Sequence, residues 1–345
     1  MNRLLAGALL AVTLTTTACA QAVTATPHAT PDAAPAPVVP ASVSCTGTGT
    51  EVADADQLQK ALAAAKPGAL IRLASGRYAG HFTLATAGTA DAPITVCGPR
   101  EAVLDGGGAG KDDAGEGSDG YTLHLDHADH VRVAGFTVQG GQKGVMVDAT
   151  SHAVLDGLLV THVGEEAVHL RRGSSDNVVR GVVIRDTGLR TAKFGEGVYI
   201  GSAKSNWCTY SDCQPDRSDD NVIEGNDIAG TTAESVDIKE GTTGGVLRSN
   251  TFSGSGMTAA DAWVNVKGNE WQIVGNTGDD APQDGFQTHR ILDGWGARNT
   301  FAENRAAVQG PGYGINVTKD DDDNHVACSN TVEAAGKGLT NITCS

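Results

Sequence analysis

The sequence predicts a right-handed parallel β-helix, an all-β solenoid in which each coil of the chain buries one face against the next. Short β-branched runs alternate with turns, and the chain holds 45 glycines, which suits a turn every few residues. An asparagine also recurs with a period in the twenties, in similar stretches such as V-L-R-S-N-T-F. Stacked amide side chains can hydrogen-bond from coil to coil. The recurring residues are Asn226, Asn250, Asn276, Asn304 and Asn330.

The N-terminal residues predict export. Residues 1–20 have a basic start at Arg3, an apolar core that is too short to span a membrane, and small residues at the end. Two cleavage sites fit. Thr16 to Cys19 resembles a lipoprotein box, which would make Cys19 a lipid-anchored residue, whereas Ala18 to Ala20 fits plain secretion. Residues 21–43 are rich in Ala, Pro and Thr and predict a flexible tether. We therefore expect an extracytoplasmic protein, secreted or lipid-anchored, whose only membrane contact is that anchor.

Cysteine usage agrees with export. The chain holds seven cysteines, and six remain without Cys19. Because exported chains are oxidised, we expect three disulfides. The expected pairs are Cys45 with Cys97, Cys208 with Cys213, and Cys328 with Cys344.

Residues 44–345 predict one β-helix domain. A short helix over Asp56–Ala65, ended by Pro67-Gly68, would cover the open end of the solenoid. Strands follow at Ala69–Leu73 and Pro93–Val96, and the coils repeat clearly from Tyr121 onward. The inward pairs that align these coils are Leu123/Leu125, Val145/Val147, Val168/Leu170, Val198/Ile200, Val236/Ile238, Val264/Val266, Phe286/Thr288 and Ile315/Val317.

Three outward rows follow from this alignment, because side chains alternate across a strand and neighbouring coils lie about 4.8 Å apart. The first row is His124, Met146, His169, Tyr199, Asp237, Asn265, Gln287 and Asn316. The second is Asp126, Asp148, Arg171, Gly201, Lys239, Lys267, His289 and Thr318. An acidic row two residues before the inward pairs comprises Glu166, Glu196, Glu234 and Asp284.

The second row places cations together on a chain whose net charge is −16. That negative balance argues against a nucleic-acid partner, so an anionic substrate would have to meet a local cluster of this kind. Lys239 lies directly beside Lys267. Like charges about 5 Å apart lower each other's proton affinity, so we expect the pKa of Lys239 to be depressed.

The segment from Glu234 to Lys239 (E-S-V-D-I-K), followed by V-L-R-S-N-T-F, resembles the catalytic coil of the chondroitinase B and alginate lyase family of parallel β-helix polysaccharide lyases, within the pectate-lyase-like superfamily. G-T-A-D-A-P-I-T-V (88–96) is similar to the first coils of that family. In the family a lysine is the Brønsted base, an arginine one coil later assists, and acids near the base hold Ca²⁺. The resemblance implies that Lys239 is the base, that Lys267 replaces the arginine, and that Glu234 and Glu196 are calcium ligands.

The expected reaction is β-elimination in an acidic, uronate-containing polysaccharide. A lyase of this kind removes the proton at C5 and expels the oxygen at C4, and a divalent cation such as Ca²⁺ neutralises the adjacent carboxylate. Asp237 works against a neutral Lys239 unless the metal engages it. Outward side chains would hold the sugar, and the candidates are Arg171, His169, Tyr199, Trp263, Asn265 and His289.

Two alternatives stay open. An inverting glycoside hydrolase needs two carboxyls roughly 6.5–9.5 Å apart, for which Asp237 with Glu196 or Asp284 could serve. A non-catalytic carbohydrate-binding surface protein could use the outward rows as a binding strip. The insertion after Gly201, with Trp207 and Tyr210, is either an aromatic platform for a sugar or a packed loop.

Overall fold

The structure, a computed structural model, describes residues 42–110, 120–319 and 323–345. The chain divides into two units, 1–38 and 39–345, and the first lies outside the described residues. The predicted export signal, Cys19 and all of the tether except residues 42 and 43 lie there too. Within the described ranges, no helix combines the length and apolar character needed to cross a membrane.

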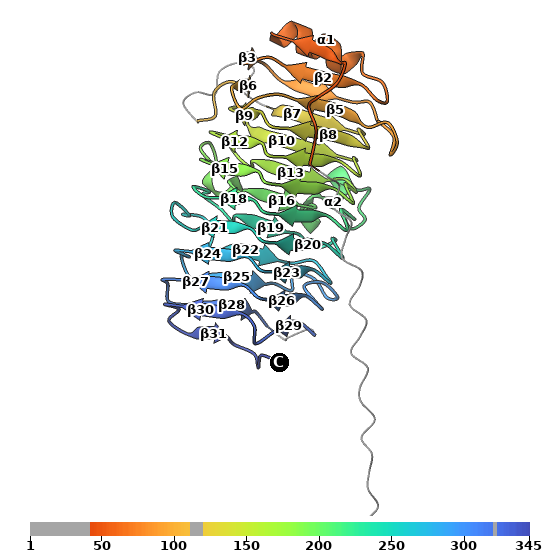
Figure 1. The fold of residues 1–345 in the computed structure, drawn as a ribbon. Helices are drawn as coiled ribbons and strands as arrows, with labels where there is room; N and C mark the ends of the chain where they lie inside the picture. Colours follow the sequence, from red (N-terminus) through yellow and green to blue (C-terminus); the bar gives the residue numbers. More distant parts are fainter. Residues whose placement is uncertain (1–41, 111–119, 320–322) are drawn as a thin grey trace, which may run out of the picture. The chain divides into compact units, whose positions relative to one another are not determined.

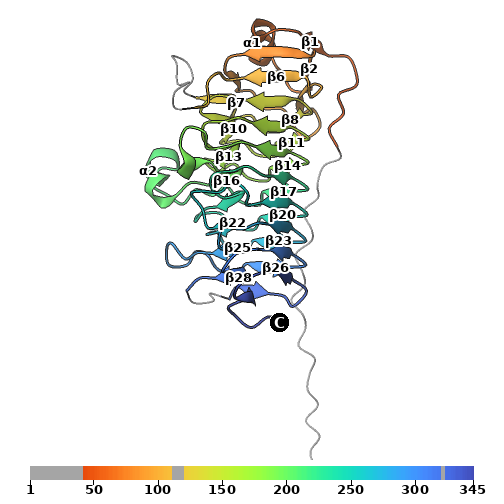
Figure 2. The ribbon, with the colours of Figure 1, turned by 90° about the vertical axis from the view of Figure 1, so that its left-hand side faces the viewer.

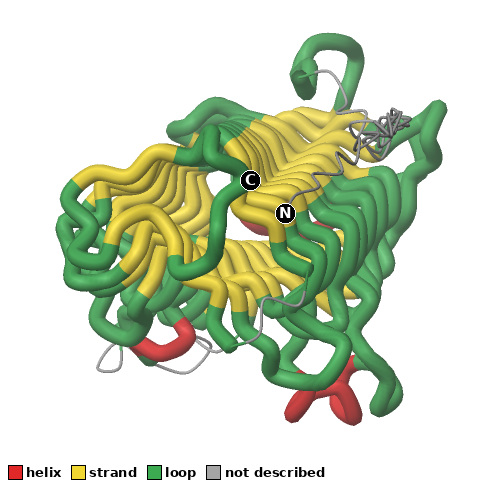
Figure 3. Tube along the Cα trace, turned by 90° about the horizontal axis from the view of Figure 1, so that it is seen from below, coloured by secondary structure: helices red, strands yellow, loops and turns green. Residues whose placement is uncertain are grey.

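The described residues of the second unit form three parallel sheets, A, B and C, whose strands stack coil on coil (Figure 1). Each complete coil gives one strand to each sheet, and the three sheets surround a common core when viewed along the axis (Figure 3). This arrangement confirms the predicted parallel β-helix.

Sheet A comprises β1 (Thr50–Val52), β2 (Leu70–Leu73), β5 (Ile94–Cys97), β8 (Val131–Ala134), β11 (Val154–Asp156), β14 (Val178–Arg180), β17 (Val222–Glu224), β20 (Val246–Arg248), β23 (Gln272–Val274), β26 (Thr300–Ala302) and β29 (His325–Val326). Sheet B comprises β3 (Gly76–Ala79), β6 (Ala102–Asp105), β9 (Thr137–Gln139), β12 (Leu159–Thr161), β15 (Val183–Arg185), β18 (Asp227–Ile228), β21 (Thr251–Ser253), β24 (Thr277–Asp279), β27 (Arg305–Ala307) and β30 (Thr331–Glu333).

Sheet C carries the outward rows. It comprises β4 (Phe82–Leu84), β7 (Tyr121–Asp126), β10 (Lys143–Asp148), β13 (Val168–Arg171), β16 (Val198–Ile200), β19 (Val236–Ile238), β22 (Ala262–Val266), β25 (Asp284–Thr288), β28 (Tyr313–Val317) and β31 (Gly338–Thr340). Its register matches the sequence alignment coil by coil, with His169 opposite Tyr199, Tyr199 opposite Asp237 and Asp237 opposite Asn265. The inward partners of these residues fill the core.

The recurring asparagines form a buried ladder at the turn between sheets A and B. The side-chain amide of Asn226 donates to Oδ1 of Asn250 at 2.9 Å, and the same bond repeats from Asn250 to Asn276, from Asn276 to Asn304 and from Asn304 to Asn330. Each rung thereby satisfies polar groups that the solenoid interior would otherwise leave unpaired. The ladder expected from the sequence is confirmed.

Helix α1 (Ala55–Ala63) lies across the end of the solenoid, as the sequence predicts (Figure 1). Asp54 caps its N-terminus by accepting a hydrogen bond from the backbone of Gln57 at 2.8 Å, and Leu58 and Leu62 are buried against the first coils. Three short helical segments lie in turns, namely η1 (Ala192–Phe194), η2 (Lys204–Asn206) and α2 (Trp207–Tyr210).

Three disulfides join the pairs expected from the sequence, Cys45–Cys97, Cys208–Cys213 and Cys328–Cys344. They fasten the segment before the first coil, the loop that holds α2, and the last coil. Figure 2 shows α2 standing out beside β13 and β16, on the side where sheet C carries its outward rows.

Candidate active site

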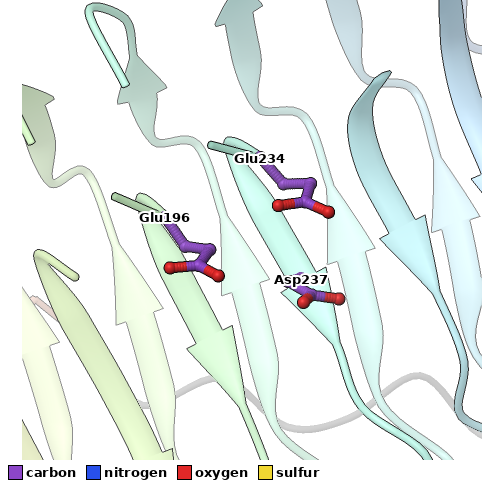
Figure 4. A group of neighbouring side chains, drawn as sticks. All are labelled: Glu196, Glu234 and Asp237. Atoms are coloured by element: carbon purple, nitrogen blue, oxygen red, sulfur yellow. The ribbon is translucent and has the colours of Figure 1, made fainter. Parts of the chain in front are cut away.

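Three carboxylates meet on the outer face of sheet C. Glu196 and Glu234 lie just before β16 and β19 on adjacent coils, and Asp237 lies within β19 (Figure 4). Each offers an oxygen, and these oxygens lie within 4.8 Å of one another. Their places follow from the local sequence. Both glutamates precede the inward valine of their strand by the same interval, so the stacking of coils brings them side by side, and Asp237 follows its valine on the outward face.

Neither glutamate of this cluster forms an ion pair with a cationic side chain of the described residues. Glu196 is 4 % exposed, and its Oε2 has no hydrogen-bond partner among the described residues. Burial, and then the charges of Glu166, Asp237 and Glu234, raise the pKa of Glu196 well above its ordinary value. Burial and the charge of Asp237 likewise raise the pKa of Glu234. A cluster of buried oxygens with excess negative charge fits a hard divalent cation such as Ca²⁺.

Asp237 lies between the two lysines. Its Oδ2 is 2.7 Å from Nζ of Lys239, and its Oδ1 is 2.5 Å from Nζ of Lys267. Although burial opposes it, the charges of both lysines lower the pKa of Asp237 to about 2. The two ammonium groups therefore share one outward ledge on adjacent coils, as the sequence predicts.

The expected depression of the pKa of Lys239 is wrong for the ion-free protein. Burial is the largest single effect and acts in that direction, but the charge of Asp237, the neighbouring Tyr199 and the hydrogen bonds to Asp237 and Lys267 together outweigh it and raise the pKa of Lys239 above its ordinary value. The reason is distance, because the carboxylate is in direct contact with the amine and lies between it and Lys267. Lys239 therefore stays an ammonium as long as the charged carboxylate of Asp237 contacts the two lysines alone.

Tyr199 lies one coil before Asp237 in the same row. Nζ of Lys239 is 4.9 Å from the centre of the Tyr199 ring, and the ring of His169 meets it edge-on at 4.4 Å. Burial raises the pKa of Tyr199, so its phenol keeps its proton. The site therefore contains a protonated phenol and the ammonium of Lys239 side by side.

His169 and Arg171 are occupied by protein contacts. Nε2 of His169 lies 3.0 Å from the carbonyl oxygen of Gly201, and the ring is 6 % exposed. The guanidinium of Arg171 donates to Asp148 at 2.7 Å and to the hydroxyl of Tyr121 at 2.9 Å. Neighbouring coils and the α2 loop surround these two side chains, and their expected contact with a sugar stays a prediction.

The insertion after Gly201 is a packed loop. Trp207 is buried and its indole N–H donates to the backbone oxygen of Ser202 at 2.9 Å, while the ring of Tyr210 lies 3.9 Å from Cζ of Arg171. The carboxylate of Asp216 is fully buried and accepts from the backbone amides of Arg172 and Gly173 and from the hydroxyl of Ser202. These contacts fix the loop beside the site.

Trp263 is not an outward ring, and this expectation is also wrong. Its side chain is fully buried, packs edge-on against Phe286 and donates to the backbone oxygen of Asp279 at 3.0 Å. The ring fills space that Gly278 and Gly285 leave open, since a Cβ on either would lie within 2.6 Å of it. The sequence holds a signal for this, because the position directly before the first inward residue is occupied on other coils by small residues: Gly144, Ala167, Gly197, Ser235, Gly285 and Gly314.

Downstream of the lysines, polar side chains continue the site. Asn265 donates through Nδ2 to Oε1 of Glu234, and its Oδ1 lies 3.1 Å from Nε2 of His289. His289 is half-buried, and its backbone N–H donates to Val266 on the coil of Lys267. Burial, and then the charge of Lys267, lower the pKa of His289. These two predicted site residues do join the lysines and the carboxylates.

Lys143 is a site-border residue that the sequence alignment missed. Its ammonium lies 2.9 Å from Glu165 and forms a second, shorter contact with Glu166. It occupies, one coil earlier, the same position relative to the inward pair as Glu166, so extending the acidic row backwards would have found it. Glu166 is thereby neutralised, whereas Glu196 and Glu234 on the next coils are not.

The two carboxylate pairs considered for an inverting hydrolase are held differently. Asp237 and Glu196 present oxygens within 4.8 Å of one another, close enough to share one cation. Asp284 is fully buried and accepts hydrogen bonds from Gln287, Asn316 and the backbone of Tyr313, so it cannot reach a substrate.

Comparisons with known proteins agree with this geometry. An alginate lyase from Paenibacillus sp. strain FPU-7 is 36% identical to the chain, and the match covers 86% of this chain and 99% of that one, with a TM-score of 0.77. The pectate lyase Pel9A (16% identity, 80% and 72% covered, TM-score 0.53) and the catalytic domain of a GH87 α-1,3-glucanase (12%, 88% and 68%, 0.51) share the fold. No family model and no curated protein sequence matches the chain.

Proposed function

The chain belongs to the family of parallel β-helix polysaccharide lyases, and from that premise we propose that it cleaves an acidic, uronate-containing polysaccharide by β-elimination with Lys239 as the base. The observation that carries the proposal is the contact of Lys239 and Lys267 with a cluster of three carboxylates on one outer face. Removal of a proton beside a carboxylate requires a base, a positively charged side chain that attracts the carboxylate, and a metal ion held by protein carboxylates.

Glu196, Glu234 and Asp237 would hold the cation, which we propose to be Ca²⁺. The unpartnered oxygen of Glu196 and the raised pKa values of both glutamates support a site that is completed by positive charge. When bound, the ion would neutralise the uronate carboxylate next to the proton that is removed.

Lys239 would take that proton once Asp237 no longer holds it as an ammonium, because the contact with Asp237 is what raises its pKa. Lys267 on the next coil would keep its charge and attract the substrate carboxylate. The phenol of Tyr199 keeps its proton and its ring lies beside Lys239, which supports a role in which it gives that proton to the departing C4 oxygen.

The test is a panel of uronate polymers (alginate, pectate, chondroitin and dermatan sulfates, glucuronans), each with and without a chelator. We expect an unsaturated uronate product, seen by its ultraviolet absorbance, from at least one polymer. Lys239→Ala should abolish it with little change in Tm, and Lys60→Ala on the exposed face of α1 is the matched control. New reducing ends without unsaturation would indicate hydrolysis, and retention on a polymer without product would indicate a binding protein; either result contradicts the proposal.

We also propose that the protein acts outside the cytoplasm. The three disulfides and the kinship with polysaccharide lyases support this location. Lipidation of Cys19 stays a prediction from the sequence, and we expect the protein to be a monomer.

A further inference from the structure

His289 is held between two amide oxygens. Its Nε2 lies 2.8 Å from Oε1 of Gln287 and 3.1 Å from Oδ1 of Asn265. Both oxygens can only accept a hydrogen bond, so Nε2 must be the nitrogen that carries the hydrogen. The ring sits on the coil next to Lys267, through the backbone bond from His289 to Val266.

The two amides cannot turn over to offer nitrogen instead. Nε2 of Gln287 donates to Oδ2 of Asp284 at 2.8 Å, and Asp284 is fully buried. Nδ2 of Asn265 donates to Oε1 of Glu234. Each amide nitrogen is therefore bound to a carboxylate, which leaves each amide oxygen facing the histidine.

A chain of side chains thus fixes the imidazole from both sides. In the neutral ring a hydrogen on Nε2 leaves a lone pair on Nδ1. Burial and the neighbouring charge of Lys267 lower the pKa of His289, which favours that neutral ring, while Asp237 and Asp261 act in the opposite direction more weakly. The half-buried ring lies in the same outward row as both lysines.

We propose that His289 is a specificity-determining residue whose Nδ1 accepts a hydrogen bond from a sugar hydroxyl beside the bond that is cleaved. The inference rests on the proposed lyase function. A lone pair attracts a hydroxyl and repels the oxygens of a carboxylate or a sulfate ester, which carry no hydrogen to donate. The site would therefore prefer a sugar ring with a free hydroxyl at this position and reject one that is sulfated there.

The tautomer is tested without any substrate. A long-range ¹H–¹⁵N spectrum of the whole protein at about pH 7, assigned by its loss in His289→Gln, should show Nδ1 of His289 unprotonated and Nε2 protonated. A protonated Nδ1, in either the other tautomer or the cationic ring, would overturn the proposal. This measurement decides the tautomer even if no polymer in the panel is cleaved.

The role is tested with two substitutions and alginate as the probe. Gln at position 289 can still donate to both amide oxygens but has no atom at the place of Nδ1, whereas Asn keeps an acceptor near Nδ1 and loses the bridge. We expect His289→Gln to raise KM about fivefold with kcat nearly unchanged, and His289→Asn to keep more of the affinity. The reverse order, with His289→Gln unaffected, would show a purely structural role and overturn the proposal. If the unchanged protein leaves alginate intact, the choice of polymer fails and the spectrum still stands as the test.

Discussion

Arg171 and Lys239 are cations of the same outward row, and each contacts a buried aspartate, yet the two coils do different things. On the first, Arg171 meets one buried carboxylate, Asp148, and aromatic rings cover the pair. On the second, one carboxylate, Asp237, is shared by two lysines and adjoins two more acids without cationic partners. An ion pair with equal opposite charges, covered by aromatic rings, stabilises the fold. A cluster on the outer face with more carboxylates than cationic partners can instead bind a cation or a substrate.

Replacing Lys239 and Arg171 in turn by an uncharged side chain should give the largest difference between the two coils, in activity for one and in stability for the other. We expect Lys239→Met to lower kcat/KM by about 10³-fold with little loss of stability, because it removes the base. Arg171→Met should instead lower the free energy of unfolding by about 3 kcal/mol, because it leaves Asp148 buried without its strongest partner. Activity assays and urea denaturation measure the two effects. Equal loss of stability in both variants would erase the distinction.

Cation binding should stabilise the cluster of Glu196, Glu234 and Asp237 and leave the Arg171–Asp148 pair unaffected. Excess Ca²⁺ should raise the free energy of unfolding by about 2.7 kcal/mol at 100 times Kd. The pKa of Glu196 is raised and a bound cation would lower it, so calorimetric titrations in buffers of different ionisation heat should show proton release.

The controls for cation binding are matched glutamates. Glu196→Gln should lose both binding and proton release, whereas Glu101→Gln, an exposed residue near the first coils, should keep them. Ca²⁺ binding with no proton exchange would contradict the raised pKa of Glu196.

The neighbouring acids Glu166 and Glu196 should respond to the same substitution with opposite signs. Although burial opposes it, His169 and Lys143 lower the pKa of Glu166 to about 2, so Glu166→Gln should destabilise the protein by about 2 kcal/mol at neutral pH. That loss of stability should shrink as pH falls from the ordinary glutamate range through about 2, because below that pH Glu166 is protonated in both the folded and the unfolded protein.

Glu196→Gln should stabilise the ion-free protein by about 1 kcal/mol, because it removes an uncompensated buried charge. The folded protein binds this proton more tightly than the unfolded chain does, so the wild type loses stability as pH rises above the ordinary glutamate range and the gain in the variant grows. Denaturation at about pH 5 and about pH 8 measures both trends. A destabilised Glu196→Gln protein would contradict the charge imbalance.

The smallest effect should come from the ring that covers Arg171. Tyr210→Leu removes a cation–π contact at 3.9 Å and should lower stability by about 1 kcal/mol, with activity unchanged. A loss of activity larger than the loss of stability would give the α2 loop a role in substrate binding.

The rows of sheet C could be predicted because they depend on only two regularities, the alternation along a strand and the pairing of successive coils. These two rules are enough to bring Asp237, Lys239 and Lys267 together from the order of residues alone. The same rules failed for Trp263, which lies within β22 directly before the inward Val264, because its side chain is fully buried as well, in space that two glycines leave open.

Other contacts depend on groups outside the rows. Arg171 was predicted on the correct face, but the loop that covers it belongs to a later insertion whose path no periodicity describes. The pKa of Lys239 was predicted in the wrong direction because the sequence placed Asp237 nearby but did not show that its carboxylate is in direct contact with both ammonium groups.

The asparagine ladder has a mechanical consequence. The asparagine bonds join each coil to the coils on either side, so a force applied along the axis should peel the solenoid in discrete steps rather than all at once. A released coil of about 26 residues would lengthen the chain by roughly 90 Å. The Cys328–Cys344 bond withholds its 16-residue span from the first extension, so reducing agents should lengthen that step alone.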